Sequence, residues 1–180
     1  MDVFEAIEKR HSYRGDFLDK PVPREDLEKI VKCGLHAPSG CNAQTTSFVI
    51  VDEPELLKQI SDIIGKPFVS QAKTIIVCVL SEQTVYHGKS FAVEDCSAAV
   101  ENMLLAITAL GYATVWLDGV IRLENRAEKI ARLLGVPSDK QVRVVLPIGV
   151  PAQQCSPNKK KKFSERAWFN KYKLKHCKEE

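Results

Sequence analysis

Several familiar signatures are missing from this sequence of 180 residues. No GxGxxG, GxxxxGK[ST], HExxH or GxSxG occurs, so nothing points to a Rossmann dinucleotide fold, a phosphate loop, a zinc protease or a serine hydrolase. The longest apolar run, Ile75 to Leu80, has six residues, whereas a membrane-spanning helix needs about twenty. The first five residues include two acidic ones and no apolar segment. We therefore expect no signal peptide and no membrane association.

Metal ligands and nucleophiles are not clustered either. The four His and six Cys are scattered, without a CxxC. Cys33, His36 and Cys41 are close in sequence but lack a fourth ligand at a known spacing, so we favour ordinary packing and expect no metal. A Cys/His nucleophile pair would lack an orienting third group. Irregularly spaced cysteines are typical of a reducing compartment, so we expect a cytoplasmic protein.

The composition is that of a folded protein with unevenly distributed charge. The chain is 44% hydrophobic and 27% charged, with a net charge of +3. Residues 159–180 hold nine Lys or Arg and three Glu, so the remainder is mildly acidic. A basic end can bind a phosphate ligand, a nucleic acid or a membrane surface. We expect no nucleic-acid binding, because few aromatic residues interleave with these charges and no recognition motif accompanies them.

Apolar periodicity predicts helices that alternate with four buried strands, which indicates an α/β or α+β sandwich. Pro147 predicts an edge position or a bulge for the last strand. From Pro151 onward we expect an extended arm whose aromatic residues pack on a partner subunit. The predicted strands are 47–51, 74–80, 113–117 and 142–150, and the predicted helices are 3–10, one between Pro23 and Pro38, 53–64, 94–110, 123–134 and 164–173.

Four segments carry candidate binding chemistry. Arg10 and Arg14 are four residues apart, so a continuing helix would place two guanidiniums and a hydroxyl on one face, suited to a phosphate dianion. Residues 38–44 offer a hydroxyl and two amides for a heteroaromatic ligand. Gly119, after a strand, lets a ligand approach the backbone. For each of these segments, and for the lysine run 159–162, an ordinary surface or connecting role is the alternative.

Taken in order, these segments resemble the FMN-dependent nitroreductase family over nearly the whole chain. The resemblance depends on the whole ordered set of segments and not on any single motif. The set comprises residues 10–14 (RHSYR), 35–44 (LHAPSGCNAQ), 48–51, 95–106, 110–111, 113–116, 144–151 (VVLPIGVP) and 162–166 (KFSER).

The resemblance implies an α+β, nitroreductase-like sandwich with a central mixed β-sheet of four to five strands flanked by helices. It implies an obligate homodimer with C-terminal arm exchange and two FMN sites at the subunit interface. Residues 1–157 would form the flavin-binding domain. Residues 158–180 would form a basic arm that belongs to the same fold and packs on the partner subunit.

The resemblance also assigns cofactor-binding residues. Near the phosphate it places Arg10, His11, Ser12, Arg14, Lys160 and Lys162. The loop supplied by the other subunit contacts the flavin and ribityl through Pro38, Ser39, Gly40, Asn42 and Gln44. The strand end at Leu117, Asp118 and Gly119 lies near the reactive flavin N5. The chain departs from the family pattern at Thr45 and Thr46 and lacks an inserted helical region, which implies a substrate pocket that is more open or differently covered.

The implied activity is an NAD(P)H-dependent FMN oxidoreductase. Hydride passes from NAD(P)H to the flavin and on to an oxidised acceptor such as a nitroaromatic or a quinone, by a ping-pong mechanism. The flavin carries the chemistry, so no catalytic protein residue is expected. The alternative is a non-enzymatic flavin-binding or sensing protein of the same fold.

Overall fold

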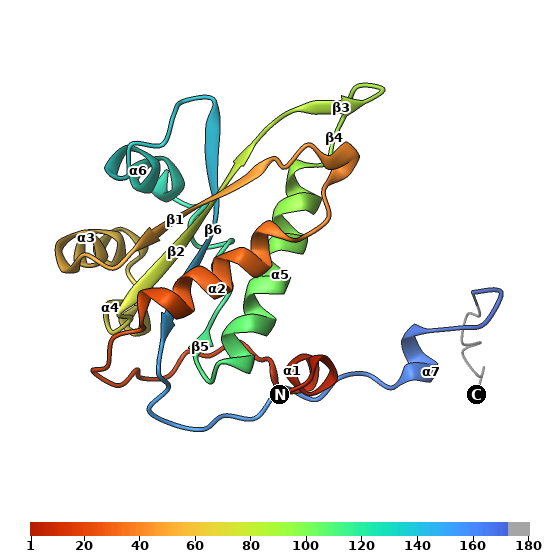
Figure 1. Cartoon of the computed structure of the whole chain (residues 1–180), viewed down its shortest axis with the longest axis horizontal. Coiled ribbons are helices and arrows are strands. Elements are labelled where there is room, and N and C mark those ends of the chain that lie inside the picture. The colour runs from red at the N-terminus through yellow and green to blue at the C-terminus, as the bar shows by residue number, and fades with distance from the viewer. Residues whose placement is uncertain (173–180) are drawn as a thin grey trace, which may run out of the picture.

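Four strands form the central sheet of the computed structural model, which describes residues 1–172 (Figure 1). The spatial order is β1 (Thr46–Val51), β2 (Thr74–Ser81), β6 (Lys140–Gly149) and β5 (Ala113–Thr114). All three pairings are antiparallel, which corrects the mixed sheet expected from the sequence. The α+β class and a sheet of four strands are confirmed.

The two middle strands are buried on both faces, which explains their continuous apolar sequences. Side chains of β2 alternate between two cores, so Ile75 and Val77 point to one side and Ile76 and Cys78 to the other. A register shift after Cys78 accommodates the twist of the β2–β6 pair.

Helices cover both faces of this sheet (Figure 1). On one face lie α2 (Arg24–Leu35) and α5 (Ala92–Ala109), which contribute Leu27, Ile30, Val100, Met103 and Ile107 to the core. On the other face lie α3 (Pro54–Ile64), the short α4 (Pro67–Ser70) and α6 (Arg126–Leu133). The short α1 (Val3–Lys9) packs against α5.

The predicted helix 123–134 begins later than expected. Glu124 and Asn125 both have a φ of 54°, the left-handed region, which a right-handed helix cannot include. These two residues instead complete a turn, and α6 begins at Arg126. The helix predicted over 94–110 is confirmed within two residues as α5, and Gly111, with a φ of 82°, follows its end.

The prediction for Pro147 is wrong in its position. Strand β6 lies between β2 and β5, and Pro147 pairs with Ile75 without a bulge at that point. The β5–β6 register runs through Ala113↔Gly149 and Thr114↔Ile148 and continues at Leu117↔Val145. In this register Pro147 lies opposite Val115, where its missing N–H interrupts the ladder. The sheet therefore tolerates an internal proline because its neighbour on that side is a short, interrupted strand.

A two-residue turn at His87-Gly88 joins β3 (Thr84–Tyr86) to β4 (Lys89–Ser90), a hairpin that was not predicted. Its residues at the turn have φ values of 44° and 75°. The hairpin projects beside the 3₁₀ turn η1 (Gly40–Asn42) at the end of the molecule where α5 begins (Figure 1).

After Pro151, which bridges to Phe17, the chain leaves the body as an arm (Figure 1). The last backbone bond to the body is donated by Ala152 N to Asp16 O, at 2.9 Å. The only helical turn of the described arm is α7 (Phe163–Arg166), which is shorter than the predicted helix 164–173. The predicted end at Lys173 lies outside the described residues. Within residues 1–172, no helix is long and apolar enough to cross a membrane.

Candidate cofactor site

The segment that follows α1 presents polar side chains because alternate residues point inward. Tyr13 is buried, its backbone N–H donates to Thr114 O at 2.9 Å, and its hydroxyl donates to Asp16 O at 2.5 Å. Ser12 and Arg14 on either side are therefore exposed. The helical spacing expected for Arg10 and Arg14 does not occur, because α1 ends at Lys9. An extended segment, rather than a helix face, displays the hydroxyl and the guanidinium.

The other two side chains of this segment are partly covered. Arg10 Nε lies 3.5 Å from Glu101 Oε1 on α5. His11 Nδ1 lies 2.9 Å from Lys9 O, and its buried Nε2 has no hydrogen-bond partner among the described residues. The segment thus combines two guanidiniums and a hydroxyl, donors that fit a phosphate.

The loop from Ser39 to Thr45 has an unusual backbone. Cys41, Asn42 and Gln44 have φ values of 50°, 54° and 50°, in the left-handed region that non-glycine residues seldom adopt. A bond from Gln44 N to Ser39 Oγ, at 3.0 Å, closes the loop across its width. Side chains of Asn42 and Gln44 are exposed, so their amides are available to a ligand.

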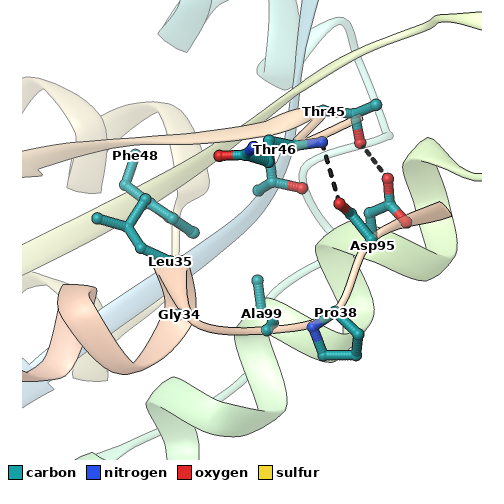
Figure 2. Close-up of a pocket in the computed structure, with 11 residues that line it drawn as sticks. Gly34, Leu35, Pro38, Thr45, Thr46, Phe48, Asp95 and Ala99 are labelled. Atoms are coloured by element: carbon teal, nitrogen blue, oxygen red, sulfur yellow. Dashed lines mark hydrogen bonds between the residues drawn. The ribbon is translucent and has the colours of Figure 1, made fainter. Parts of the chain in front are cut away.

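Asp95, in the first turn of α5, holds both ends of this loop. Its Oδ1 accepts from Gly40 N at 2.8 Å and its Oδ2 accepts from Thr45 Oγ1 at 2.7 Å. Figure 2 shows the carboxylate turned toward Thr45 beneath the loop. A cavity of about 120 Å³ lies between the loop, the end of α2 and α5, and Asp95 and Thr45 line it. Neither residue was predicted to belong to the site, because the contacts between Asp95 and the loop span 55 and 50 positions of the sequence.

The third predicted element is the strand end at Leu117, Asp118 and Gly119. Leu117 is buried and pairs with Val145. Asp118 Oδ1 lies 2.8 Å from Arg122 Nε, so its carboxylate is engaged by a guanidinium. Around the ideal Cβ position of Gly119 no heavy atom lies within 4 Å. The backbone at Gly119 therefore faces open space.

The fourth element, the lysine run, lies on the arm. Lys160 and Lys162 are exposed, and Lys162 N donates to Glu165 Oε2 at 3.0 Å. Among residues 1–172, no group of three His, Cys, Asp or Glu side chains is placed to hold a metal ion, and this includes Cys33, His36 and Cys41.

One chain brings only part of the predicted site together. Tyr13 ties the 10–14 segment to β5, the strand that ends toward Gly119. The 38–44 loop is tied to the first turn of α5, at the opposite end of this helix of 18 residues (Figure 1). The arm with Lys160 and Lys162 extends away from both (Figure 1).

Large apolar side chains are exposed on two parts of the surface. The outward face of α1 carries Phe4, 74% exposed, and a groove of about 370 Å³ beside it runs between α1, α2 and α5. On the arm, Phe163, Phe169 and Tyr172 are also exposed, Phe169 to 81%. Large apolar side chains exposed in this way are typical of an interface.

Comparison with known proteins gives one consistent result. A family model described as "Nitroreductase family" matches residues 7–150. A candidate NADH dehydrogenase/NAD(P)H nitroreductase of Methanothermobacter thermautotrophicus is 38% identical over 157 residues, covering 85% of this chain and 79% of the relative.

Two solved structures share the architecture. A candidate NADH dehydrogenase/NAD(P)H nitroreductase from Bacteroides thetaiotaomicron has a TM-score of 0.83 at 26% identity, covering 94% of this chain and 98% of the other. An FMN-dependent nitroreductase from Clostridium difficile has a TM-score of 0.80 at 26% identity, covering 94% of this chain and 99% of the other.

Proposed function

The chain belongs to the nitroreductase family of enzymes, and from that premise we propose that it is an FMN-dependent oxidoreductase. It takes a hydride from NAD(P)H and reduces an oxidised acceptor, such as a nitroaromatic or a quinone, in a ping-pong cycle. When bound, FMN supplies the carrier chemistry between the two half-reactions. The names of the relatives, which include NAD(P)H nitroreductases and an FMN-dependent nitroreductase, support this proposal.

The observation that carries the proposal is the link between Tyr13 and Thr114. It fixes the exposed Ser12 hydroxyl and Arg14 guanidinium beside β5. Gly119 follows Thr114 by five residues, which is a distance of about 16 Å along an extended chain. A phosphate held by the arginines and a planar ring against the open backbone of Gly119 match this arrangement.

In this proposal the chain's residues bind and orient, and none needs to titrate. The guanidiniums of Arg10 and Arg14 neutralise the phosphate, and His11 and Ser12 lie beside it. Asn42 and Gln44 donate hydrogen bonds to the ring edge, and their donors stabilise negative charge that develops on it. Leu117, Asp118 and Gly119 line the side on which hydride arrives. The open space at Gly119 leaves room for the nicotinamide and then for the acceptor.

The site is completed by a second copy of the chain. The 38–44 loop and the 10–14 segment lie at opposite ends of α5 in one chain, so the loop reaches an FMN held by the partner (Figure 1). The exposed apolar face of α1 and the aromatic arm supply an interface, with the arm of residues 158–180 packed on the partner and Lys160 and Lys162 at the phosphate. The cytoplasmic location expected from the cysteines stays a prediction.

The test is the visible spectrum of the purified protein after FMN is added and excess is removed. We expect retained flavin bands, bleached by NAD(P)H and restored by a quinone. Arg14→Gln should lower FMN retention about tenfold, while Arg132→Gln, an exposed arginine on α6, should leave it unchanged. A wild-type protein that retains no FMN would overturn the proposal. Retained FMN without NAD(P)H oxidation would favour the non-enzymatic alternative.

A further inference from the structure

Asp95 is a buried carboxylate with an unusual position. Its side chain is 5% exposed, and no Lys or Arg of the described residues lies within ion-pair distance of it. A buried carboxylate is costly unless hydrogen bonds satisfy it. Here the Gly40 N–H and the Thr45 hydroxyl do so, one to each oxygen, and the first turn of α5 adds a favourable helix dipole.

The two groups that donate hydrogen bonds to Asp95, the Gly40 N–H and the Thr45 hydroxyl, lie at opposite ends of the strained part of the loop. Between Gly40 and Thr45 are the three left-handed residues Cys41, Asn42 and Gln44. Each such residue costs about 1–2 kcal/mol, so the loop keeps this shape only if its surroundings impose it. A Cβ on Gly40 would overlap the ring of Phe91, so the loop also packs closely against the residue that precedes α5.

This arrangement fixes the direction of the exposed amides. Gln44 stands between two held points, because its own N–H donates to Ser39 Oγ and the next residue is bound to Asp95. Asn42 lies within the closed loop. Both amides are therefore pre-organised at the surface without contacting Asp95 themselves.

We propose that Asp95 is a positioning residue for the cofactor, which acts through Gly40 and Thr45 to aim Asn42 and Gln44 at the flavin. The inference rests on the proposed function, since it concerns FMN affinity. It assigns a role to a side chain that does not touch the cofactor.

The sharpest variant is Thr45→Val, which keeps the shape of the side chain and removes the hydroxyl donor. Thr45→Ser keeps the hydroxyl and serves as the conservative rescue. Thr74→Val is the matched control, because Thr74 is fully buried and its hydroxyl has no partner among the described residues. Asp95→Ala removes both contacts, and Asp95→Asn can keep both if its amide donates to Thr45.

The first measurement is hydrogen exchange of residues 39–45 in the protein without FMN. We expect faster exchange in Thr45→Val and Asp95→Ala, and wild-type exchange in Thr45→Ser and Thr74→Val. Because no flavin is present, this readout tests whether Asp95 holds the loop, separately from the proposed function. Equal exchange in all variants would show that Asp95 and Thr45 do not hold the loop, which would overturn the proposal.

The second measurement is a double-mutant cycle on the FMN dissociation constant. Thr45→Val and Gln44→Ala should each weaken binding about tenfold, and the double variant by clearly less than a hundredfold, because both changes remove the Gln44 contact. A hundredfold loss in the double variant would mean that Thr45 acts independently of Gln44, which overturns the positioning role. A wild-type protein without FMN affinity would instead overturn the proposed function itself.

Discussion

Two glycines show how differently single positions constrain this molecule. Gly119 has open space around its Cβ position, whereas a Cβ on Gly149 would lie 2.7 Å from the ring of Phe17. Neither has a positive φ, so only contacts decide what a side chain would do. The empty space at Gly119 therefore serves no packing purpose within the chain, which fits a position reserved for a ligand.

Gly119→Ala should leave the free energy of unfolding within about 0.5 kcal/mol of wild type, because the new methyl group meets nothing. It should weaken FMN binding, because the methyl group occupies the space proposed for the ring. Gly149→Ala should instead lower stability by about 1–3 kcal/mol, because Phe17 must move. Denaturant unfolding and FMN titration check both. Unchanged FMN affinity in Gly119→Ala would remove Gly119 from the site.

Cysteine reactivity should divide by burial. Cys78 and Cys96 are buried, which raises the pKa of both thiols, that of Cys96 to about 11, whereas Cys155 is exposed on the arm. Because the thiolate is the reactive form, brief alkylation at pH 8 should label the exposed Cys33, Cys41 and Cys155 and spare Cys78 and Cys96. Peptide mass spectrometry measures this, with the protein in guanidinium chloride as the control in which Cys78 and Cys96 are labelled too. Rapid labelling of Cys96 in the native protein would show that α5 opens.

At the scale of elements, one hydrogen bond joins the start of α2 to the chain after α5. Tyr112 Oη donates to Asp26 Oδ2 at 2.8 Å, and Lys29 Nζ lies 2.9 Å from Oδ1. Lys29 first, and then Tyr112, lower the pKa of Asp26. Burial and the Asp26 carboxylate raise the pKa of Tyr112 from 10.0 to about 12.

The bond should make stability depend on alkaline pH. The folded state favours the protonated phenol, so the stabilisation is complete below pH 10 and is lost as pH rises through 12. Its size is about 1 kcal/mol, because Tyr112 is partly exposed and solvent weakens the interaction. The difference in unfolding free energy between wild type and Tyr112→Phe should shrink between pH 10 and 12. A difference that stays constant over this range would contradict the role of Asp26.

Elements whose pattern is local were predictable from the sequence. The apolar stripes of α2, α3 and α5 and the apolar run of β2 each lie within one segment, so periodicity alone located them. The β3–β4 hairpin was missed because its turn is His87-Gly88 instead of the usual Asn-Gly or Asp-Gly pair. Pro147 was placed wrongly because its effect depends on Val115 of another strand.

The same distinction holds at the candidate site. Residues with binding chemistry could be named from the sequence, because each carries a hydroxyl, an amide or a guanidinium. The arrangement of these residues could not be predicted, because it depends on long-range contacts. The bond from Tyr13 to Thr114 orients the 10–14 segment, and the bond from Gly40 to Asp95 orients the 38–44 loop. Because α1 ends at Lys9, the spacing of Arg10 and Arg14 alone could not predict whether the two side chains lie on one helix face.

At the scale of the whole molecule, the chain separates binding groups that the proposed function needs together. The family resemblance inferred from the sequence is confirmed over residues 7–150, and this range ends where the arm begins. The arm exposes large aromatic side chains beside its lysines, and exposed apolar surface of this kind is typical of a contact with another molecule. Their burial on a partner would complete the interface and bring positive charge to the phosphate.

Removal of residues 158–180 tests this arrangement, because Ala152 makes the last backbone bond from arm to body within residues 1–172. The shortened protein should keep its secondary structure and cooperative unfolding, but light scattering should shift from dimer toward monomer, and FMN affinity should fall more than tenfold. A full-length variant with Lys160→Gln and Lys162→Gln separates the effect of charge from that of packing. It should stay dimeric, because no apolar surface is removed. Its FMN affinity should fall about tenfold, because the charge-assisted contacts to the phosphate are lost. A shortened protein that stays dimeric with unchanged FMN affinity would contradict both the exchanged arm and its phosphate contacts, and would leave the α1 face as the whole interface.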